Sequence, residues 1–235
     1  MINHSVDIPN QKVAKFAGFL FLLSLLVPLF NWTFILSKLI VTENAIDTAH
    51  NILTNEFLFR INIINEVLIS AVATALAVAL YIMLKSVNKN LALLALFLKL
   101  TESILSAIIA LGHTAALLML TDKSSLSGLE PKQIQAFIGL FLNVHILVTA
   151  IPGIFLGLNL VIFLSLLYKS NYVPRWLSGF GVLSYTLIFI YDSSMILLPN
   201  FSTILIVQII GWGPSILFEV LIGIWLLFKG IKVQI

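Results

Sequence analysis

The sequence lacks cysteine entirely, and only 10% of its 235 residues are Asp, Glu, Lys or Arg. The absence of cysteine excludes disulfides, thiolate nucleophiles and cysteine-ligated metals. A soluble domain usually carries about 25% charged residues, so the low charge argues against a soluble domain. The Lys and Arg residues are scattered without a basic block, so nucleic acid is not an expected partner.

The recognisable motifs of soluble enzymes are also absent. The sequence contains no glycine-rich phosphate loop, no His-Glu-x-x-His, no Gly-x-Ser-x-Gly and no dinucleotide-binding fingerprint. These absences favour a protein that is not an enzyme, and we expect no cofactor. A bound cation or metal is left open.

Hydrophobic residues make up 60% of the chain, and the mean hydropathy is +1.10. We therefore predict an integral membrane protein with the lipid bilayer as its surroundings and one polytopic domain over residues 1–235. About 20 apolar residues are needed to cross a bilayer as a helix. Six runs satisfy that length, and we predict an all-α bundle of six transmembrane helices. The predicted spans are approximately 15–37, 57–84, 90–120, 134–168, 175–198 and 204–229.

The distribution of Lys and Arg predicts the orientation of these spans, because cytoplasmic loops are enriched in both. With the N-terminus inside, the inner segments hold eight of them: Lys12, Lys15, Lys85, Lys89, Lys169, Arg175, Lys229 and Lys232. The outer segments hold four: Lys38, Arg60, Lys123 and Lys132. No small-x-small cleavage pattern follows the first apolar run, so we expect it to be an uncleaved span. We predict a multi-pass cell-membrane protein with both termini in the cytoplasm.

The first outer loop contains a segment that is too polar to cross the membrane. Residues 41–56 are polar, with Ile46, Ile52 and Leu53 at intervals. This pattern favours a short amphipathic helix on the outer surface of the bilayer.

A polar stripe runs through the third span. Lys99, Glu102, Ser106, Ala110 and His113 recur at three- and four-residue steps, so they share one face of a helix. Ionisable groups inside a membrane are energetically costly, and they usually face the protein interior or a watery cavity. We therefore expect this face to point into the bundle.

Comparable stripes occur on the second, fourth, fifth and sixth spans. Since lipid cannot satisfy polar groups, we expect the stripes to converge in a polar, acid-rich pocket inside the bundle. The candidate residues for ligand or ion binding are Glu66, Lys99, Glu102, His145, Asp192 and Glu219. The supporting polar residues are Asn62, Ser106, Thr149, Asn159, Tyr185 and Gln208.

The charges within the predicted spans do not balance. The spans contain four acidic residues and one buried cation, Lys99. Four ionised carboxylates would be very unfavourable in a low dielectric. A site that titrates or binds a cation is therefore the minimal expectation. Several simpler arrangements remain open: a structural ion pair between Lys99 and Glu102, a pair between Arg60 and Glu66, and an interfacial position for His113.

Five stretches resemble the bacterial integral membrane family catalogued as domain of unknown function 4386. They are AHNILTNEFLFRINI (49–63), LYIMLKSVNKNLALLALFLKLTES (80–103), GLFLNVHILVTAIPGIFLGLNLVIFLSLLYKSNYVPRWLSG (139–179), YTLIFIYDSSMILLP (185–199) and PSILFEVLIGIWLLFKG (214–230). The resemblance implies six helices, with Glu102, His145, Asp192 and Glu219 at polar positions of the pattern. Asn159 stands where the pattern would have a histidine, which weakens the case for a His-rich metal site. The resemblance implies no reaction.

Three functions are compatible with these features. The first is binding or transport of a small solute or of protons by the intramembrane carboxylates, with Pro152 and Pro214 as hinges. The second is a metal-dependent lipid hydrolase in which His145, Asp192 and a glutamate hold the metal and a water. The third is a non-catalytic sensor or partner subunit. The sequence favours the first, and it predicts no oligomeric state.

Overall fold

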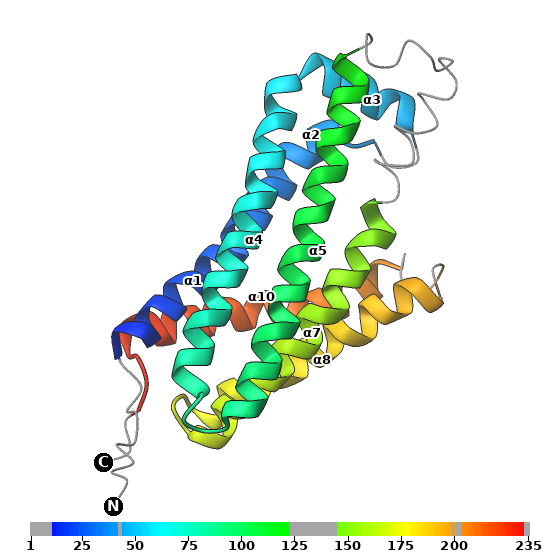
Figure 1. The fold of residues 1–235 in the computed structure, drawn as a ribbon. Helices are drawn as coiled ribbons and strands as arrows, with labels where there is room; N and C mark the ends of the chain where they lie inside the picture. The colour runs from blue at the N-terminus through cyan, green and yellow to red at the C-terminus, as the bar shows by residue number, and fades with distance from the viewer. Residues whose placement is uncertain (1–10, 42–43, 123–144, 199, 201–203, 233–235) are drawn as a thin grey trace, which may run out of the picture.

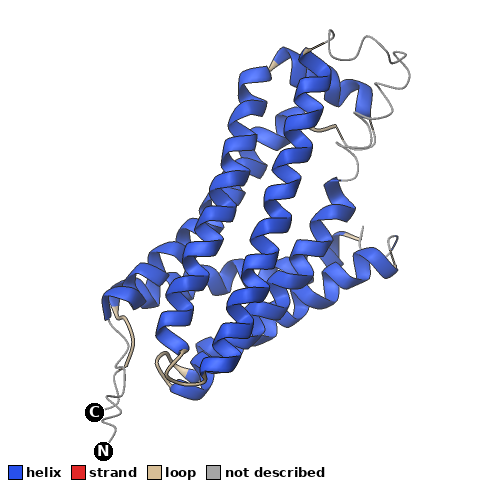
Figure 2. Cartoon of the chain, in the orientation of Figure 1, coloured by secondary structure: helices blue, strands red, loops and turns tan. Residues whose placement is uncertain are grey.

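The computed structural model describes residues 11–41, 44–122, 145–198, 200 and 204–232, and these parts of the chain contain helices and no strand (Figure 2). The helices are α1 (Gln11–Phe30), the π-helical η1 (Asn31–Leu36), α2 (Ser37–Leu39), α3 (Ala45–Thr54), α4 (Glu56–Leu84), α5 (Lys89–Thr121), α7 (His145–Ser170), α8 (Arg175–Leu197) and α10 (Leu205–Phe228).

Six helical segments are long and apolar enough to cross a membrane. They are Gln11–Leu39, Glu56–Leu84, Lys89–Thr121, Thr149–Ser170, Arg175–Leu197 and Leu205–Phe228. The prediction of a multi-pass, all-helical membrane protein with six spans is confirmed. The predicted start of the fourth span at residue 134 lies outside the described residues.

The contacts between the six long helices follow chain order and close into a ring. Figure 1 shows the bundle from the side, with α4 beside α5 and α7 beside α8. Each of α1, α4, α5, α7 and α8 packs against the next long helix, and α10 packs against α1 to complete the ring. A smaller contact between α4 and α7 crosses the ring. Polar side chains on the inner faces of different helices can therefore meet each other without contacting lipid.

The buried faces of the ring include a packed apolar core. Phe218 of α10 makes edge-to-face contacts there with the rings of Phe21 and Tyr185, at centroid distances of 6.2 and 5.9 Å. All three rings are fully buried. The outward faces carry large exposed apolar side chains, as expected for helices that contact lipid.

The ends of the helices follow local capping rules. The Asn88 side chain accepts a hydrogen bond from Leu91 N–H at the start of α5. Gly230 ends α10 in the left-handed conformation with φ of 66°, which glycine adopts without strain. A Cβ at Gly230 would lie 2.0 Å from Oε1 of Gln11, because that oxygen accepts from Ile231 N–H. The beginning of α1 is thereby joined to the end of α10.

The first span contains a local irregularity near Pro28. Pro28 lies inside α1, and three residues later the helix widens into the π-helical η1. Short π-helical segments inside α-helices are often found at functional sites. Here the segment begins at Asn31, whose side chain is 4% exposed and points into the protein.

Candidate functional site

The central polar site begins with an ion pair on α5. Lys99 Nζ lies 2.8 Å from Glu102 Oε1, as the i, i+3 spacing predicts, and both side chains are buried. The second carboxylate oxygen of Glu102 accepts from Asn159 Nδ2 of α7, also at 2.8 Å. One carboxylate therefore joins a cation on its own helix to an amide on the neighbouring helix.

A second carboxylate faces the same site from the other side of the ring. The Tyr185 hydroxyl of α8 donates to Oε1 of Glu219 of α10. Glu219 is also within electrostatic range of Lys99 and Glu102. Four helices, α5, α7, α8 and α10, thus supply the site with one ammonium, two carboxylates, one amide and one phenol.

Two polar atoms are buried without a hydrogen-bond partner among the described residues, one on the residue that donates to Glu102 and one on the residue that follows Glu102 in the sequence. They are Oγ of Ser103 and Oδ1 of Asn159. Buried polar groups are nearly always satisfied, so such acceptors call for an explanation. Ser103 is not among the residues predicted for the site, although it adjoins Glu102 in the sequence. Ser106 donates to the backbone carbonyl of Glu102 on its own helix.

A separate polar cluster lies toward the other end of α5. His113 Nδ1 is 2.8 Å from Oε1 and 2.9 Å from Oε2 of Glu66 on α4. Asn62 Nδ2 donates to Glu66 and also lies 3.4 Å from His113 Nδ1. His113 is eleven residues beyond Glu102, which places it roughly 16 Å along the helix at about 1.5 Å per residue. The predicted residues thus divide into two clusters.

The first helix completes this outer cluster. Asn31 Nδ2 donates to Asn62 Oδ1 at 2.8 Å, and Asn31 Oδ1 accepts from Asn65 Nδ2 at 3.2 Å. Neither Asn31 nor Asn65 is among the predicted site residues. The available signal was Asn31 itself, which is the one amide in the apolar run of residues 16–36.

Two of the simpler arrangements concern His113 and Arg60. His113 is buried among the helices, with 2% of its side chain exposed and its ring on Glu66, while its depth in the bilayer stays a prediction. Arg60 does not pair with Glu66, because Glu56, one helical turn away, lies closer, with 2.5 Å between the charged atoms. That pair is solvent-exposed, whereas the Glu66–His113 pair lies inside the ring.

Asp192 occupies a third position, on the face of α8 that contacts α7. Its side chain packs so closely on Gly153 that a Cβ there would lie 2.0 Å from Oδ2. Asp192 is 2% exposed, and its Oδ2 has no hydrogen-bond partner in the described part of the chain. Among the described residues, no hydrogen bond joins Asp192 to the central site or to the Glu66–His113 cluster.

The remaining candidates lie at the edge of this arrangement. α7 begins at His145, whose side chain is not among those that the structure describes. Thr149 is half-buried, and Gln208 lies on an exposed face of α10 instead of in the bundle interior. Within the described residues, no three His, Cys, Asp or Glu side chains are grouped as a metal site would need. The structure therefore adds no observation in favour of the lipid hydrolase alternative.

A closed ring of six membrane-crossing helices around buried polar residues defines a multi-pass integral membrane protein. The chain belongs to the family described as Domain of unknown function (DUF4386), whose model matches residues 16–230. The resemblance seen in the sequence is thereby confirmed. No curated protein and no solved structure matches the chain.

Proposed function

We propose that this protein binds a proton or a small cation at the central site, as part of binding or transporting a small solute or protons. The observation that carries the proposal is a second carboxylate, Glu219, within electrostatic range of the buried Lys99–Glu102 ion pair. If all three groups are ionised, the site carries one excess negative charge. An uncompensated charge is strongly unfavourable away from water, so a proton or a cation must balance it.

The neighbouring polar atoms suit either occupant. Asn159, which donates to Glu102, has a buried Oδ1 that lacks a partner among the described residues. Oxygen atoms of amides, hydroxyls and carboxylates are the ligands that hard cations prefer. The Tyr185 hydroxyl holds one oxygen of Glu219 and leaves its other oxygen for a proton or an ion.

Two prolines provide a means of moving the site. Pro152 lies inside α7 and Pro214 inside α10, and each removes a backbone hydrogen bond from its helix. Asn159 and Glu219 follow these prolines by one to two turns. A change of bend at either proline would therefore move a residue of the central site relative to α5, which is the kind of motion transport requires.

We place the protein in the cell membrane with both termini in the cytoplasm. The support is the excess of Lys and Arg at the end of the bundle that holds the α4–α5 and α7–α8 turns. The helix α3 then lies in the outer loop between η1 and α4, where its exposed Ile46 and Leu53 suit contact with the bilayer surface.

The proposal is tested on the purified full-length protein. Its thermal unfolding is followed over a range of pH and in sodium, potassium or a bulky organic cation. A ligand at about one hundred times its Kd stabilises a protein by about 2.7 kcal/mol. We expect a midpoint that depends on pH or on the cation, and we expect Glu102→Gln and Glu219→Gln to remove that dependence.

Glu56→Gln is the matched control, because Glu56 is an exposed carboxylate paired with Arg60 outside the ring. It should leave the dependence on pH and cation as it is in the wild type. If the wild type shows no such dependence, or if Glu102→Gln and Glu219→Gln retain it, the proposed site is wrong.

A further inference from the structure

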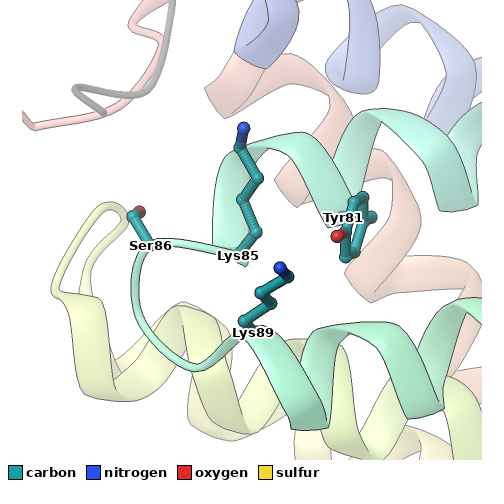
Figure 3. Close-up of a pocket in the computed structure, with 4 residues that line it drawn as sticks. All are labelled: Tyr81, Lys85, Ser86 and Lys89. Carbon is teal, nitrogen blue, oxygen red and sulfur yellow. The ribbon is translucent and has the colours of Figure 1, made fainter. Parts of the chain in front are cut away.

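A cavity of about 310 Å³ lies at the turn between α4 and α5, away from both polar clusters. It is lined by Tyr81, Lys85, Ser86 and Lys89. Figure 3 shows Lys85 rising from the end of α4 and Lys89 extending from the first turn of α5 toward Tyr81. The lining therefore combines two ammonium groups with two hydroxyl groups, and it contains no acidic side chain.

A third hydroxyl lies next to this lining. The Tyr172 hydroxyl, from the α7–α8 turn, is 3.3 Å from Oγ of Ser86. Donors from two different turns thus lie at the same end of the bundle. Ammonium and hydroxyl groups that line one cavity are suited to an anion with several oxygen atoms, of which phosphate is the commonest.

The surrounding end of the molecule is basic. The described helix ends and turns here carry eight Lys or Arg residues and no Asp or Glu: Lys12, Lys15, Lys85, Lys89, Lys169, Arg175, Lys229 and Lys232. Two of these cations lie on aromatic rings, with Arg175 over Tyr168 and Lys229 over Trp225, at 5.7 and 4.4 Å. Aromatic and basic side chains together are typical of the membrane–water interface.

The position and size of the cavity favour a phospholipid headgroup as the source of the phosphate. The cavity lies where α4 leaves the membrane, at the level at which lipid headgroups lie. Its volume is at the small end of the range for ligand sites, which suits a headgroup whose acyl chains remain outside. Basic pockets between transmembrane helices are known to bind anionic headgroups.

We infer that the Lys85–Lys89 cavity binds the phosphate of an anionic phospholipid headgroup. The two ammonium groups compensate its charge, and the hydroxyls of Tyr81, Ser86 and Tyr172 donate to its oxygen atoms. The inference does not depend on the ion site proposed above, because neither site shares a residue with the other.

The test measures lipid binding to the full-length protein in nanodiscs. Thermal unfolding is compared in phosphatidylcholine alone and with added phosphatidylglycerol, and bound lipid is counted by native mass spectrometry. Loss of any two Lys near an anionic surface should weaken binding by up to roughly thirtyfold, at a factor of about five each. Lys85→Gln with Lys89→Gln also removes the contacts with the phosphate, so this variant should weaken phosphatidylglycerol binding by clearly more than this roughly thirtyfold effect. The stabilisation by phosphatidylglycerol should disappear in this double variant.

Lys169→Gln with Lys232→Gln is the matched control, because it removes two exposed charges from the same end outside the cavity. This control should weaken binding by no more than the roughly thirtyfold surface effect, and so by clearly less than the cavity variant. Equal loss in both double variants would show only a general surface attraction and would overturn the site. A further arm adds inorganic phosphate in phosphatidylcholine. If inorganic phosphate stabilises the wild type as much as phosphatidylglycerol does, the assignment to a lipid is wrong.

Discussion

Lys99 is the one buried Lys or Arg among the residues that the structure describes. Its ammonium pairs with Glu102 and lies within electrostatic range of Glu219, so it is the fixed positive charge of the central site. The proximity of an opposite charge favours the ionised carboxylate, whereas burial alone would favour a neutral one. The residue chemistry of the site therefore depends on Lys99 more than on any other side chain.

Lys99→Met should destabilise the protein by about 3–5 kcal/mol, since it leaves a buried carboxylate without its partner. The measurement is the free energy of unfolding in mixed micelles. Replacing both partners, as Lys99→Met with Glu102→Leu, should recover much of that loss, because the carboxylate that had lost its ammonium is removed as well, while Glu219 keeps its hydrogen bond from Tyr185. A single variant as stable as the wild type would contradict the assignment of a buried pair.

At the scale of elements, the contact between α7 and α8 depends on small residues of α7. Gly153 accommodates the Asp192 carboxylate, and Gly157 lies against the backbone of α8, where a Cβ would meet Tyr185 O at 2.9 Å. The Gly-x-x-x-Gly spacing is typical of close helix packing. Here the motif packs two helices of one chain, so it gives no indication of a dimer.

Gly153→Ala should therefore destabilise the protein by about 1–3 kcal/mol through overpacking against Asp192. Gly179→Ala is the control on α8, since its Cβ would meet only Tyr168 carbon atoms at 3.6 and 3.8 Å. That change should be neutral or stabilising by up to about 1 kcal/mol, because alanine is the better helix former. Thermal unfolding of the two variants in one detergent distinguishes these results, and an equal response would contradict the packing argument.

The outer cluster joins three elements through one amide. Asn62 of α4 accepts from Asn31 of η1, donates to Glu66, and lies beside His113 of α5. Asn65 makes one of the hydrogen bonds to the same Asn31 side chain. Replacing Asn62 would therefore leave more groups without a hydrogen-bond partner than replacing Asn65.

Asn62→Ala should cost about 2–3 kcal/mol, and Asn65→Ala about 1 kcal/mol, because a buried group that loses its partner pays its desolvation cost. Both free energies of unfolding are measured in the same micelles. An equal cost for the two changes would show that Asn62 does not connect the three helices.

At the scale of the whole molecule, the bundle has two chemically different ends. The described turns at the end nearest Gln11 and Ile231 are basic, and these two residues join the adjacent helices α1 and α10 through hydrogen bonds. The opposite end carries α3 and the acidic residues Asp47, Glu56 and Asp122. This difference is what predicts the orientation of the protein in the bilayer.

The absence of cysteine allows a direct test of that orientation. Ser86→Cys lies at the basic end and Asn55→Cys at the opposite end, and both positions are exposed. In whole cells, a membrane-impermeant thiol reagent should label Asn55→Cys and leave Ser86→Cys unlabelled until the membrane is opened. The parent protein is the unlabelled control. The reverse pattern would place the termini outside.

The six spans and their approximate limits were predictable, because a membrane-crossing helix is set by a local property, about 20 consecutive apolar residues. The Lys99–Glu102 pair was predictable for a similar reason, since both residues are one turn apart on the same helix. The polar faces of α4 and α5 were also predictable from their periodicity. Each of these features depends only on residues close together in the sequence.

The partners across the ring depended instead on how each helix is rotated and where along its length it meets its neighbours. Glu66 reaches His113 and not Arg60, and Glu219 accepts from Tyr185, because the helices bring these side chains to the same depth. The widened turn at Asn31 directs that amide inward, which periodicity does not indicate. Only the packing of the six helices divides one expected pocket into a central site, an outer cluster and the isolated Asp192.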